Sequence, residues 1–213
     1  MTTRETMNDA MGARTSEARR IAELSRQIIR DIVPDDSREG SIKRRVVMAT
    51  GNPQFAGLLT FLHSPIEAGV TALCRGADIH VDINMVRVGI SKDIRRLGGH
   101  VFCALPESDA LSDQGLTRAA AGLLKSRNRL TGSIVVIGNA PSAAVTLGSM
   151  VDEGCAPALI VATPVGFVDA SRSKELIRLL TIPSITTVGT QGGTPVAVAI
   201  ANELISMALQ RSC

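Results

Sequence analysis

Residues 138–150, GNAPSAAVTLGSM, have the types and spacing of a turn that binds a ligand at the start of a helix. They follow the apolar, β-branched run SIVVI at positions 133–137, which is typical of a strand buried on both faces. Gly138 allows a sharp turn, Asn139 can cap a helix, and Pro141 fits a first helical turn. The free amides and partial positive charge of such a helix N-terminus can bind an anionic or carbonyl group. An ordinary strand-to-helix connection is the alternative interpretation of this motif.

The elements that position this turn form a regular alternation of strand and helix patterns. Strands are predicted at residues 58–62, 78–81, 100–104, 133–137, 159–162 and 185–188. Helices are predicted at residues 65–74, 84–90, 115–127, 141–153, 171–180 and 193–209, after two earlier helices that begin near residues 16 and 38. This order predicts an α/β protein whose mostly parallel sheet of five to six strands carries helices on both faces. We expect a loose tail at residues 1–15 and a single domain at residues 16–213.

Ligands of parallel α/β sheets bind beyond the carboxyl ends of the strands, so the residues after each strand are the candidate site. Asp82 follows the second predicted strand, and Gly138 and Asn139 follow the fourth. Loops rich in small residues follow the fifth and sixth strands, at residues 163–167 and 189–194. Backbones of this composition can approach a large ligand closely and donate their amides to it. A Gly-Gly pair before a helix is also a common turn device, so no one loop decides the function.

Composition favours an anionic small molecule over nucleic acid as the ligand. The 213 residues carry a formal net charge of +3. Trp and Tyr are absent and only four Phe are present, so the stacking platforms of single-strand nucleic-acid-binding proteins cannot be built. The four cysteines show neither Cys-x-x-Cys spacing nor another pairing pattern, so no metal site and no disulfide frame is predicted, and we expect reduced thiols. The chain shows no apolar run of about 18 residues and no secretory signal near Met1, which predicts a cytoplasmic protein without membrane contact.

The loop motifs taken together are more specific than any one of them. Three loop motifs closely resemble the precorrin-8X methylmutase family of cobalamin biosynthesis: GNAPS at 138–142, PVGFV at 164–168 followed by SKE at 173–175, and GGT at 192–194. Four further motifs follow the order and spacing of the same family: SRQII at 25–29, RVVMATGNP at 45–53, DINMV at 82–86 and TRAA at 117–120. The resemblance covers essentially everything after the N-terminal tail.

This resemblance implies a flavodoxin-like, three-layer α/β/α fold, a homodimer, and an anionic tetrapyrrole substrate edged with carboxylates. The implied reaction is an isomerisation, in which a methyl group migrates from carbon 11 to carbon 12 at ring C of precorrin-8X or cobalt-precorrin-8, giving hydrogenobyrinate or cobyrinate. No cofactor is implied. Such a migration needs the macrocycle held in a bent shape and a proton placed near a ring nitrogen.

The same resemblance assigns substrate-binding roles to individual residues. Ser25 and Arg45 match binding positions of the family, and a compact hydroxyl and a planar guanidinium both suit carboxylates. Arg118 and Lys174 match further basic positions and are assigned to peripheral carboxylates, with a solvated surface charge as the alternative. The remaining predicted binding residues lie in the loops after the strands: Asp82, Gly138, Asn139, Gly192 and Gly193.

Met48 stands where the family carries the histidine assigned as proton donor and acceptor. A thioether has no titratable proton, so Met48 is not competent as a general acid or base. His80, at the end of the second predicted strand beside Asp82, is the possible substitute. Two alternatives stay open: a homologue that binds a corrinoid without catalysis, and an engineered or product-trapping substitution that packs on the tetrapyrrole face. An unrelated nucleotide-binding protein is disfavoured, because neither a P-loop nor a Rossmann glycine pattern occurs.

Overall fold

The structure of the protein, a computed structural model, describes residues 15–105 and 115–211. The helices of this part are α1 Ser16–Ile32, α2 Arg38–Thr50, α3 Phe55–Leu58, α4 Pro65–Cys74, α5 Asn84–Gly89, α6 Arg118–Lys125, α7 Pro141–Asp152, α8 Ala170–Leu179 and α9 Thr194–Gln210. The strands are β1 Leu59–Leu62, β2 Ile79–Val81, β3 Val101–Cys103, β4 Ile134–Ile137, β5 Leu159–Ala162 and β6 Ser184–Thr187. The predicted loose tail lies outside the described residues except for Thr15, whose hydroxyl accepts a hydrogen bond from the amide of Ala18 and caps α1.

The strands of the described residues form one six-stranded sheet in the order β1-β6-β5-β4-β2-β3. β1 pairs antiparallel with β6, and the other neighbours are parallel. The order of the parallel strands is that of flavodoxin-like sheets, with the reversal of strand order between β2 and β4. The predicted flavodoxin-like, mostly parallel α/β fold is therefore confirmed.

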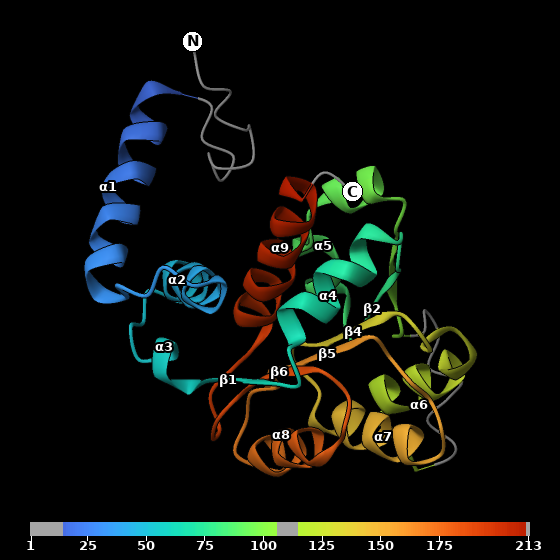
Figure 1. Cartoon of the computed structure of the whole chain (residues 1–213). Helices are drawn as coiled ribbons and strands as arrows, with labels where there is room; N and C mark the ends of the chain where they lie inside the picture. The colour runs from blue at the N-terminus through green and yellow to red at the C-terminus, as the bar shows by residue number, and fades with distance from the viewer. Residues whose placement is uncertain (1–14, 106–114, 212–213) are drawn as a thin grey trace.

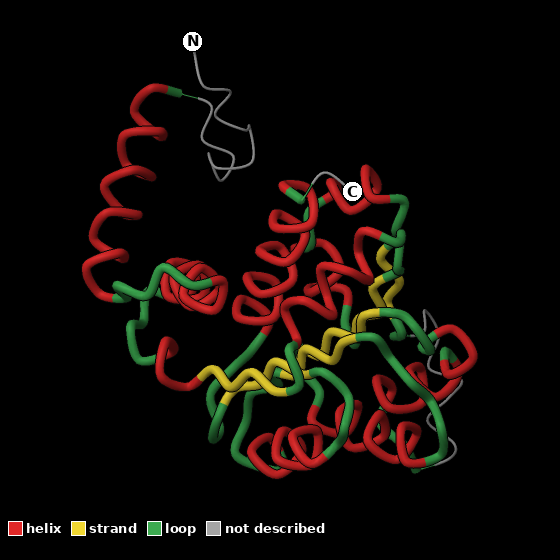
Figure 2. Tube along the Cα trace, in the orientation of Figure 1, coloured by secondary structure: helices red, strands yellow, loops and turns green. Residues whose placement is uncertain are grey.

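Helices cover both faces of the sheet, so the molecule has three layers (Figures 1 and 2). On one face, Ile134 and Val136 of β4 pack into a core with α2, α4, α5 and α9. On the other face, Val135 and Ile137 pack against α6, α7 and α8. Each of these four side chains is at most 1% exposed, and burying a side chain of this size contributes about 1.5–3 kcal/mol. The continuous apolar run of β4 therefore forms a central strand, as its pattern predicts.

α1 and α2 form an arm beside this core. Ser37 caps α2 by accepting a hydrogen bond from the amide of Gly40, and Gly51 ends it in a left-handed conformation with φ 65°. α1 packs on α2 through a small cluster that includes Ile29 and Val33. Figure 1 shows α1 standing away from the three layers. Beside this contact, α1 also carries exposed apolar side chains, at Ile21, Leu24, Ile28 and Ile32.

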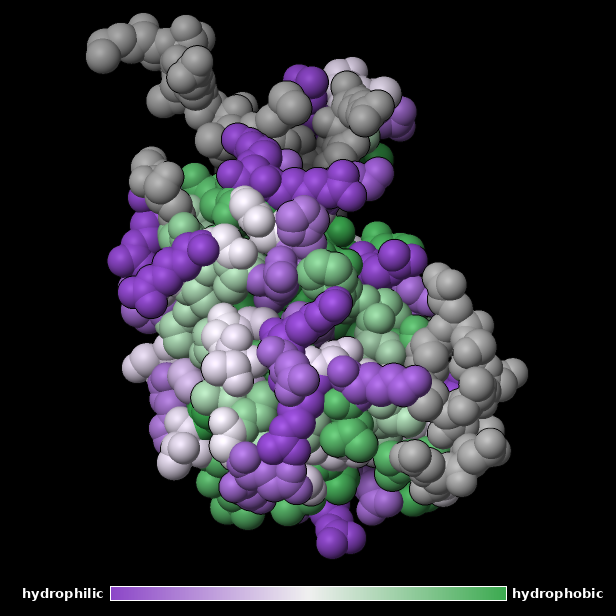
Figure 3. Space-filling model, turned by 90° about the vertical axis from the view of Figure 1, so that its right-hand side faces the viewer, coloured by the Kyte–Doolittle hydropathy of each residue, from purple (hydrophilic) through white to green (hydrophobic). Residues whose placement is uncertain are grey.

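The sheet ends at β3, which has only β2 as a strand neighbour in the described residues. Figure 3 views this end of the molecule and shows hydrophilic side chains gathered near the centre of the face. β3 is three residues long. A short strand beside polar side chains gives another chain little to pair with, which protects this edge from aggregation.

Two observations bear on the expected environment of the protein. Cys74 is disulfide-bonded, whereas Cys103 and Cys155 carry free thiols. The expectation of reduced thiols is therefore wrong for Cys74, because pairing depends on proximity in the fold and not on spacing along the chain. Among residues 15–105 and 115–211, no helix is both long and apolar enough to cross a bilayer.

Candidate functional site

The loops that follow β4, β5 and β6 lie side by side and form a continuous rim at the carboxyl edge of the sheet. The amide of Thr163 donates to the carbonyl of Ile137 at 2.8 Å, which joins the first two loops. The amide of Gly193 donates to the carbonyl of Thr163 at 2.7 Å, and that of Gly166 donates to the carbonyl of Thr190 at 3.0 Å. The rim is therefore a hydrogen-bonded unit in which the predicted glycine loops are brought together.

Gly192 marks the closest approach of two of these loops. A Cβ atom at this position would lie 2.2 Å from the carbonyl oxygen of Thr163 and 3.0 Å from that of Pro164. Those atoms belong to the backbone, so a side chain would force the loops apart. Gly193 has φ 108°, a conformation that favours glycine. Both residues therefore shape the rim, and their predicted contact with substrate stays a prediction.

Asp82 occupies the helix N-terminus that the sequence predicts as an anion site. Its carboxylate is fully buried and accepts hydrogen bonds from the amides of Gly138 at 3.1 Å, Asn139 at 2.8 Å and Ala140 at 2.8 Å. A side-chain carboxylate thus neutralises the positive end of α7. These amides are not free donors for a ligand, so this part of the prediction is wrong. Asp82 joins β2 to β4 at the point where the strand order reverses.

The expected roles of the turn residues also change. Ala140 is the N-cap residue of α7, and no side chain on that residue caps the helix, so Asn139 is not the cap. Asn139 is exposed at the rim, where its amide side chain can meet a ligand. A Cβ atom on Gly138 would lie 2.6 Å from Val86 and 3.1 Å from Ala197. Gly138 is therefore needed because α5 and α9 pack against it. Pro141 occupies the first turn of α7, as predicted.

Lys174 lies beneath the rim and not at its periphery. The side chain is fully buried, and its Nζ donates to Thr187 Oγ1 at 3.0 Å and to the carbonyl of Gln191 at 2.8 Å. Burial, and secondarily the charge of Arg178, lowers the pKa of Lys174 to about 8. The alternative of a solvated surface charge is wrong for this residue. Arg178 donates to Thr186 Oγ1 at 3.1 Å, so two cations hold the end of β6.

Arg118 begins α6 at the same edge of the sheet. The preceding Thr117 caps α6 through the amide of Ala120, and its Oγ1 lies 2.6 Å from Ser142 Oγ in the first turn of α7. This contact places the start of α6 beside the start of α7. Arg118 is exposed there, which suits the predicted contact with a peripheral carboxylate.

Ser25 lies on α1, and Arg45 and Met48 lie on α2, so all three belong to the α1–α2 arm. Ser25 is partly buried and donates to the carbonyl of Ile21 at 2.8 Å, a bond within its own helix. Arg45 Nη1 pairs with Glu203 Oε2 on α9 at 2.7 Å, and both side chains are mostly buried. The prediction gives no sign of this ion pair, because Glu203 is 158 residues away along the chain. The rim residues Asp82, Gly138 and Asn139 lie at β2 and β4, with β5 and β6 between them and the arm.

The rim also carries exposed apolar side chains that the sequence interpretation missed. Phe167 is 95% exposed and Val168 is 79% exposed, in the loop after β5. Val165, in the same loop, and Val188, in the loop after β6, are also exposed, though less fully. The signal for them is present in the motif PVGFV, because a large aromatic residue next to glycine in a loop has no core to enter. An apolar surface of this kind suits the face of a flat ring system.

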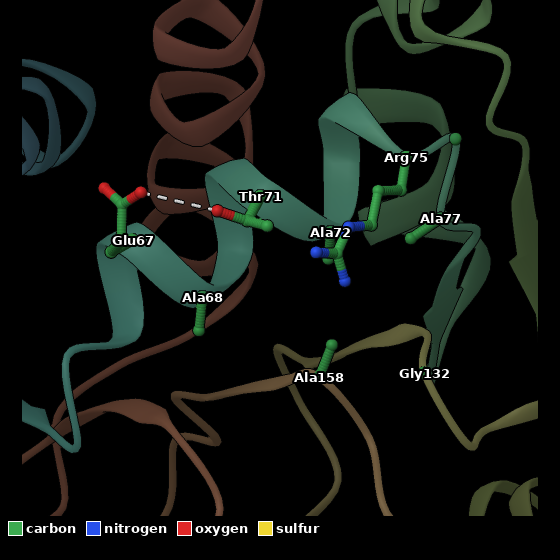
Figure 4. Close-up of a pocket in the computed structure, with 9 residues that line it drawn as sticks. Glu67, Ala68, Thr71, Ala72, Arg75, Ala77, Gly132 and Ala158 are labelled. Atoms are coloured by element: carbon green, nitrogen blue, oxygen red, sulfur yellow. Dashed lines mark hydrogen bonds between the residues drawn. The ribbon is translucent and has the colours of Figure 1, made fainter. Parts of the chain in front are cut away.

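Two of the hollows on the surface of the described residues bear on the site. One, of about 480 Å³, is at the opposite, amino-terminal edge of the sheet, where Arg75 lies over it and Thr71 bonds to Glu67 (Figure 4). Arg211, and to a lesser degree Arg38, also binds Glu67 and lowers its pKa. Because ligands of such sheets bind at the carboxyl edge, this hollow is not part of the candidate site.

The second hollow, of about 410 Å³, flanks β3 and reaches the carboxyl edge at Asn84 and Leu105. Arg87 and Lys125 line it. It therefore extends the rim with positive charge, which suits an anionic ligand.

A protein-family model described as precorrin-8X methylmutase matches residues 20–207 of the chain. The chain belongs to the precorrin-8X methylmutase family. This membership confirms the resemblance drawn from the loop motifs, and cobalamin biosynthesis is the pathway to which that resemblance points. The three-layer fold and the rim described above are thus the scaffold of a precorrin-8X methylmutase-like protein.

Individual relatives agree with the family assignment. The cobalt-precorrin-8 methylmutase of Methanocaldococcus jannaschii is 40% identical over 209 residues, which cover 93% of this chain and 98% of that protein. The precorrin-8X methylmutase of Pseudomonas aeruginosa is 39% identical over 166 residues, covering 75% of this chain and 80% of that one. A solved structure of precorrin-8X methylmutase from Thermus thermophilus matches with a TM-score of 0.84 and 30% identity, covering 91% of this chain and 97% of that one.

Two residues bear on proton transfer in this methylmutase-like protein: Met48, at the position predicted for the family's histidine, and His80, its possible substitute. Met48 is partly buried and packs against the cluster of Ile29, Val33 and Val47. Its thioether offers no proton.

His80 does not have the setting expected of a substitute acid. It lies inside β2, is 2% exposed, and stacks on Phe102 with ring centroids 5.4 Å apart. Neither imidazole nitrogen has a hydrogen-bond partner in the described residues, and burial lowers the pKa of His80. Asp82 does not orient it, because the carboxylate of Asp82 binds the three amides of the α7 turn. His80 is therefore a neutral core residue at neutral pH.

Proposed function

We propose that this chain binds a carboxylate-edged tetrapyrrole at the carboxyl rim and catalyses the methyl migration that converts precorrin-8X or cobalt-precorrin-8 into hydrogenobyrinate or cobyrinate. The observation that carries the proposal is the 40% identity to a cobalt-precorrin-8 methylmutase over 93% of this chain. Relatives of both kinds, named for precorrin-8X and for cobalt-precorrin-8, match the chain, so the proposal leaves the metal content of the substrate open.

The reaction requires a bent macrocycle and a proton near a ring nitrogen, but no second substrate. In the migration the bond from the methyl carbon to carbon 11 breaks and a bond to carbon 12 forms, so substrate and product contain the same atoms and no electrons are exchanged with a second molecule. The protein therefore contributes shape and charge: it holds the macrocycle in a bent conformation and stabilises the altered charge distribution of the ring system. Phe167 and Val168 supply an apolar surface at the rim, and Arg118 supplies a cation for a peripheral carboxylate.

A second candidate function is supported by Met48. Because this side chain stands at the position of the family's proton-transferring histidine and the buried His80 is poorly placed to replace it, a non-catalytic corrinoid-binding protein is the alternative. General acid–base catalysis typically contributes about 10²–10⁴-fold to a rate. The loss of the histidine would therefore leave a slow enzyme or a binding protein with the same rim.

A turnover assay separates these two functions. Purified protein is incubated with precorrin-8X, and the visible spectrum is followed: conversion to the orange product supports the enzyme, and a stable shifted spectrum without product supports the binding protein. Met48→His is expected to raise the rate by about 10²-fold or more if the histidine's proton transfer is what is missing. Met48→Leu is the matched control, since it preserves packing in the Ile29 and Val33 cluster without adding a proton, and its rate should equal that of the unaltered chain. Absence of both binding and turnover would contradict both functions.

We propose that the protein forms a homodimer through α1. The exposed residues Ile21, Leu24, Ile28 and Ile32 recur at helical spacing and form one apolar stripe. A stripe on a projecting helix is self-complementary in a two-fold contact. Sedimentation analysis should show a dimer for the unaltered chain and a monomer for the double variant Leu24→Asp, Ile28→Asp, while Glu23→Gln on the polar face should stay dimeric. A monomeric unaltered chain would contradict the proposal.

A cytoplasmic location stays a prediction from the sequence.

A further inference from the structure

The buried ammonium of Lys174 joins α8 to the end of β6 and to the loop that follows β6. Lys174 is the fifth residue of α8, and its side chain is fully buried. Nζ donates to Thr187 Oγ1, at the end of β6, and to the carbonyl of Gln191, in the rim loop. Thr187 Oγ1 in turn donates to the same Gln191 carbonyl at 2.7 Å. The three groups form a closed hydrogen-bonded triangle under the loop at residues 188–193.

This loop is linked onward to the rest of the rim. Thr190, next to Gln191, accepts a hydrogen bond from the amide of Gly166, and Gly193 donates to Thr163. Fixing Gln191 therefore fixes the register between the loop after β6 and the loop after β5. The loop has two glycines with positive φ, Gly189 and Gly193, so its backbone has little intrinsic preference for one conformation.

Burying the charge of Lys174 costs desolvation free energy that a purely structural side chain would avoid. Within residues 15–105 and 115–211 no carboxylate forms an ion pair with Lys174, so its charge is buried without a counter-ion. Replacing buried charges by apolar groups of similar volume is often neutral or stabilising. A lysine kept under such conditions is therefore better explained by what its ammonium does to the loop.

We propose that Lys174 is a positioning residue whose ammonium holds the loop at residues 188–193 in the conformation that receives substrate. Deprotonation removes one N–H donor and the charge, so the hold on Gln191 weakens when Lys174 is neutral. The substrate consequence rests on the proposed function, but the hold on the loop is a property of the ligand-free protein.

The charged groups around Lys174 define how this hold depends on pH. Arg178, on the same helix, is the charge that acts on Lys174. β5 and β6, which pack against α8, contribute only uncharged side chains. The one charged residue of α7, Asp152, lies in its last turn, whereas Lys174 lies near the start of α8. Because the pKa of Lys174 is lowered to about 8, mainly by burial, the loop should be held at pH 7 and released progressively between pH 7 and pH 9.

Amide hydrogen exchange measured by mass spectrometry on the ligand-free protein tests the hold directly. We compare the unaltered chain with Lys174→Met, Lys174→Arg and the control Arg172→Met, which removes an exposed cation from the same helix. At pH 7, Lys174→Met should lower the protection factors of residues 188–193 by about tenfold or more, since a hydrogen bond to a charged group is worth about 1.5–3 kcal/mol. Arg172→Met should leave these protection factors unchanged. Both variants, Lys174→Met and Arg172→Met, should have a thermal stability close to that of the unaltered chain.

The pH series gives the second readout. In the unaltered chain the protection of residues 188–193, corrected for intrinsic exchange, should fall between pH 7 and pH 9, whereas Lys174→Arg should retain it because a guanidinium stays charged. Equal protection in the unaltered chain and Lys174→Met overturns the proposal. If Lys174→Met does not fold, a flat pH profile of the unaltered chain overturns it instead. With precorrin-8X present, Lys174→Met should raise KM more than it lowers kcat. If the loop responds as described but no tetrapyrrole binds, the proposed function fails and the positioning role of Lys174 stands.

Discussion

Replacing Asp82 by asparagine is the sharpest test of how the carboxyl rim is built. The carboxylate Oδ1 accepts the Gly138 amide, and Oδ2 accepts the amides of Asn139 and Ala140. The side chain of an asparagine has one oxygen, so with that oxygen facing Asn139 and Ala140 its NH₂ group must face the Gly138 amide, and the bond to Gly138 is lost.

The magnitude follows from these contacts. Losing one charge-assisted hydrogen bond removes about 1.5–3 kcal/mol, and the two remaining bonds weaken to about half their strength once the charge is gone. The easier burial of a neutral side chain offsets part of this loss. Asp82→Asn should therefore lower the free energy of unfolding by about 2–4 kcal/mol.

The assay is equilibrium unfolding in urea, followed by circular dichroism. Asp152→Asn, in the last turn of α7, is the matched control. Because the side chain of Asp152 is exposed, the free energy of unfolding should change by no more than about 0.5 kcal/mol. If Asp82→Asn also changes stability by less than about 0.5 kcal/mol, the carboxylate does not organise the turn, and the assignment of Asp82 to the helix N-terminus would be refuted.

Three other substitutions test separate parts of the structure. His80→Phe should make the protein lose less stability on acidification. Because burial lowers the pKa of His80 in the folded chain, the unfolded chain binds a proton below pH 6.5 that the folded chain does not bind. This difference lowers the free energy of unfolding by up to about 1.4 kcal/mol per pH unit. Equal losses between pH 7 and pH 5 in both chains, measured by urea unfolding, would contradict this. Gly192→Ala should destabilise the protein by about 1–3 kcal/mol, because its Cβ atom would meet the backbone of Thr163. Gly148→Ala is the control: no atom lies near a Cβ at this position of α7, so this change should stabilise the protein by about 0.5–1 kcal/mol. Thermal unfolding compares the two variants, and equal shifts in melting temperature would contradict the close approach of the loops at Gly192. Phe167→Ala should weaken tetrapyrrole binding in a spectral titration without altering the melting temperature, because the ring is 95% exposed, and unchanged affinity would remove the rim's apolar surface from the site.

The sequence was informative wherever a property depends on local pattern. The buried run of β4, Pro141 in the first turn of α7 and the start of α2 near residue 38 could all be predicted, because period, capping and φ preference act over a few residues. The position of the rim could also be predicted, because parallel strands end at one edge of a sheet.

The rest depends on which distant residues meet. Asp82 has no local feature that marks it as the acceptor for amides 56 to 58 residues further on. The burial of Lys174 likewise follows from how α8 packs on β6, since S-K-E near a helix start is also typical of an exposed surface. His80 was expected near the ligand because it precedes Asp82, but alternation along β2 puts it in the core against Phe102. In each case packing between distant segments, and not local pattern, determined the setting of the side chain.

The pairing of β1 with β6 has a consequence for how the chain matures. Leu59–Leu62 leaves the ribosome early, whereas its hydrogen-bonding neighbour Ser184–Thr187 is among the last segments to be translated. Until then the amides and carbonyls of β1 have no place in the sheet, and the α1–α2 arm that precedes it has no α9 to rest on. The α1–α2 arm and β1 are therefore completed last, although they are synthesised before the rest of the sheet.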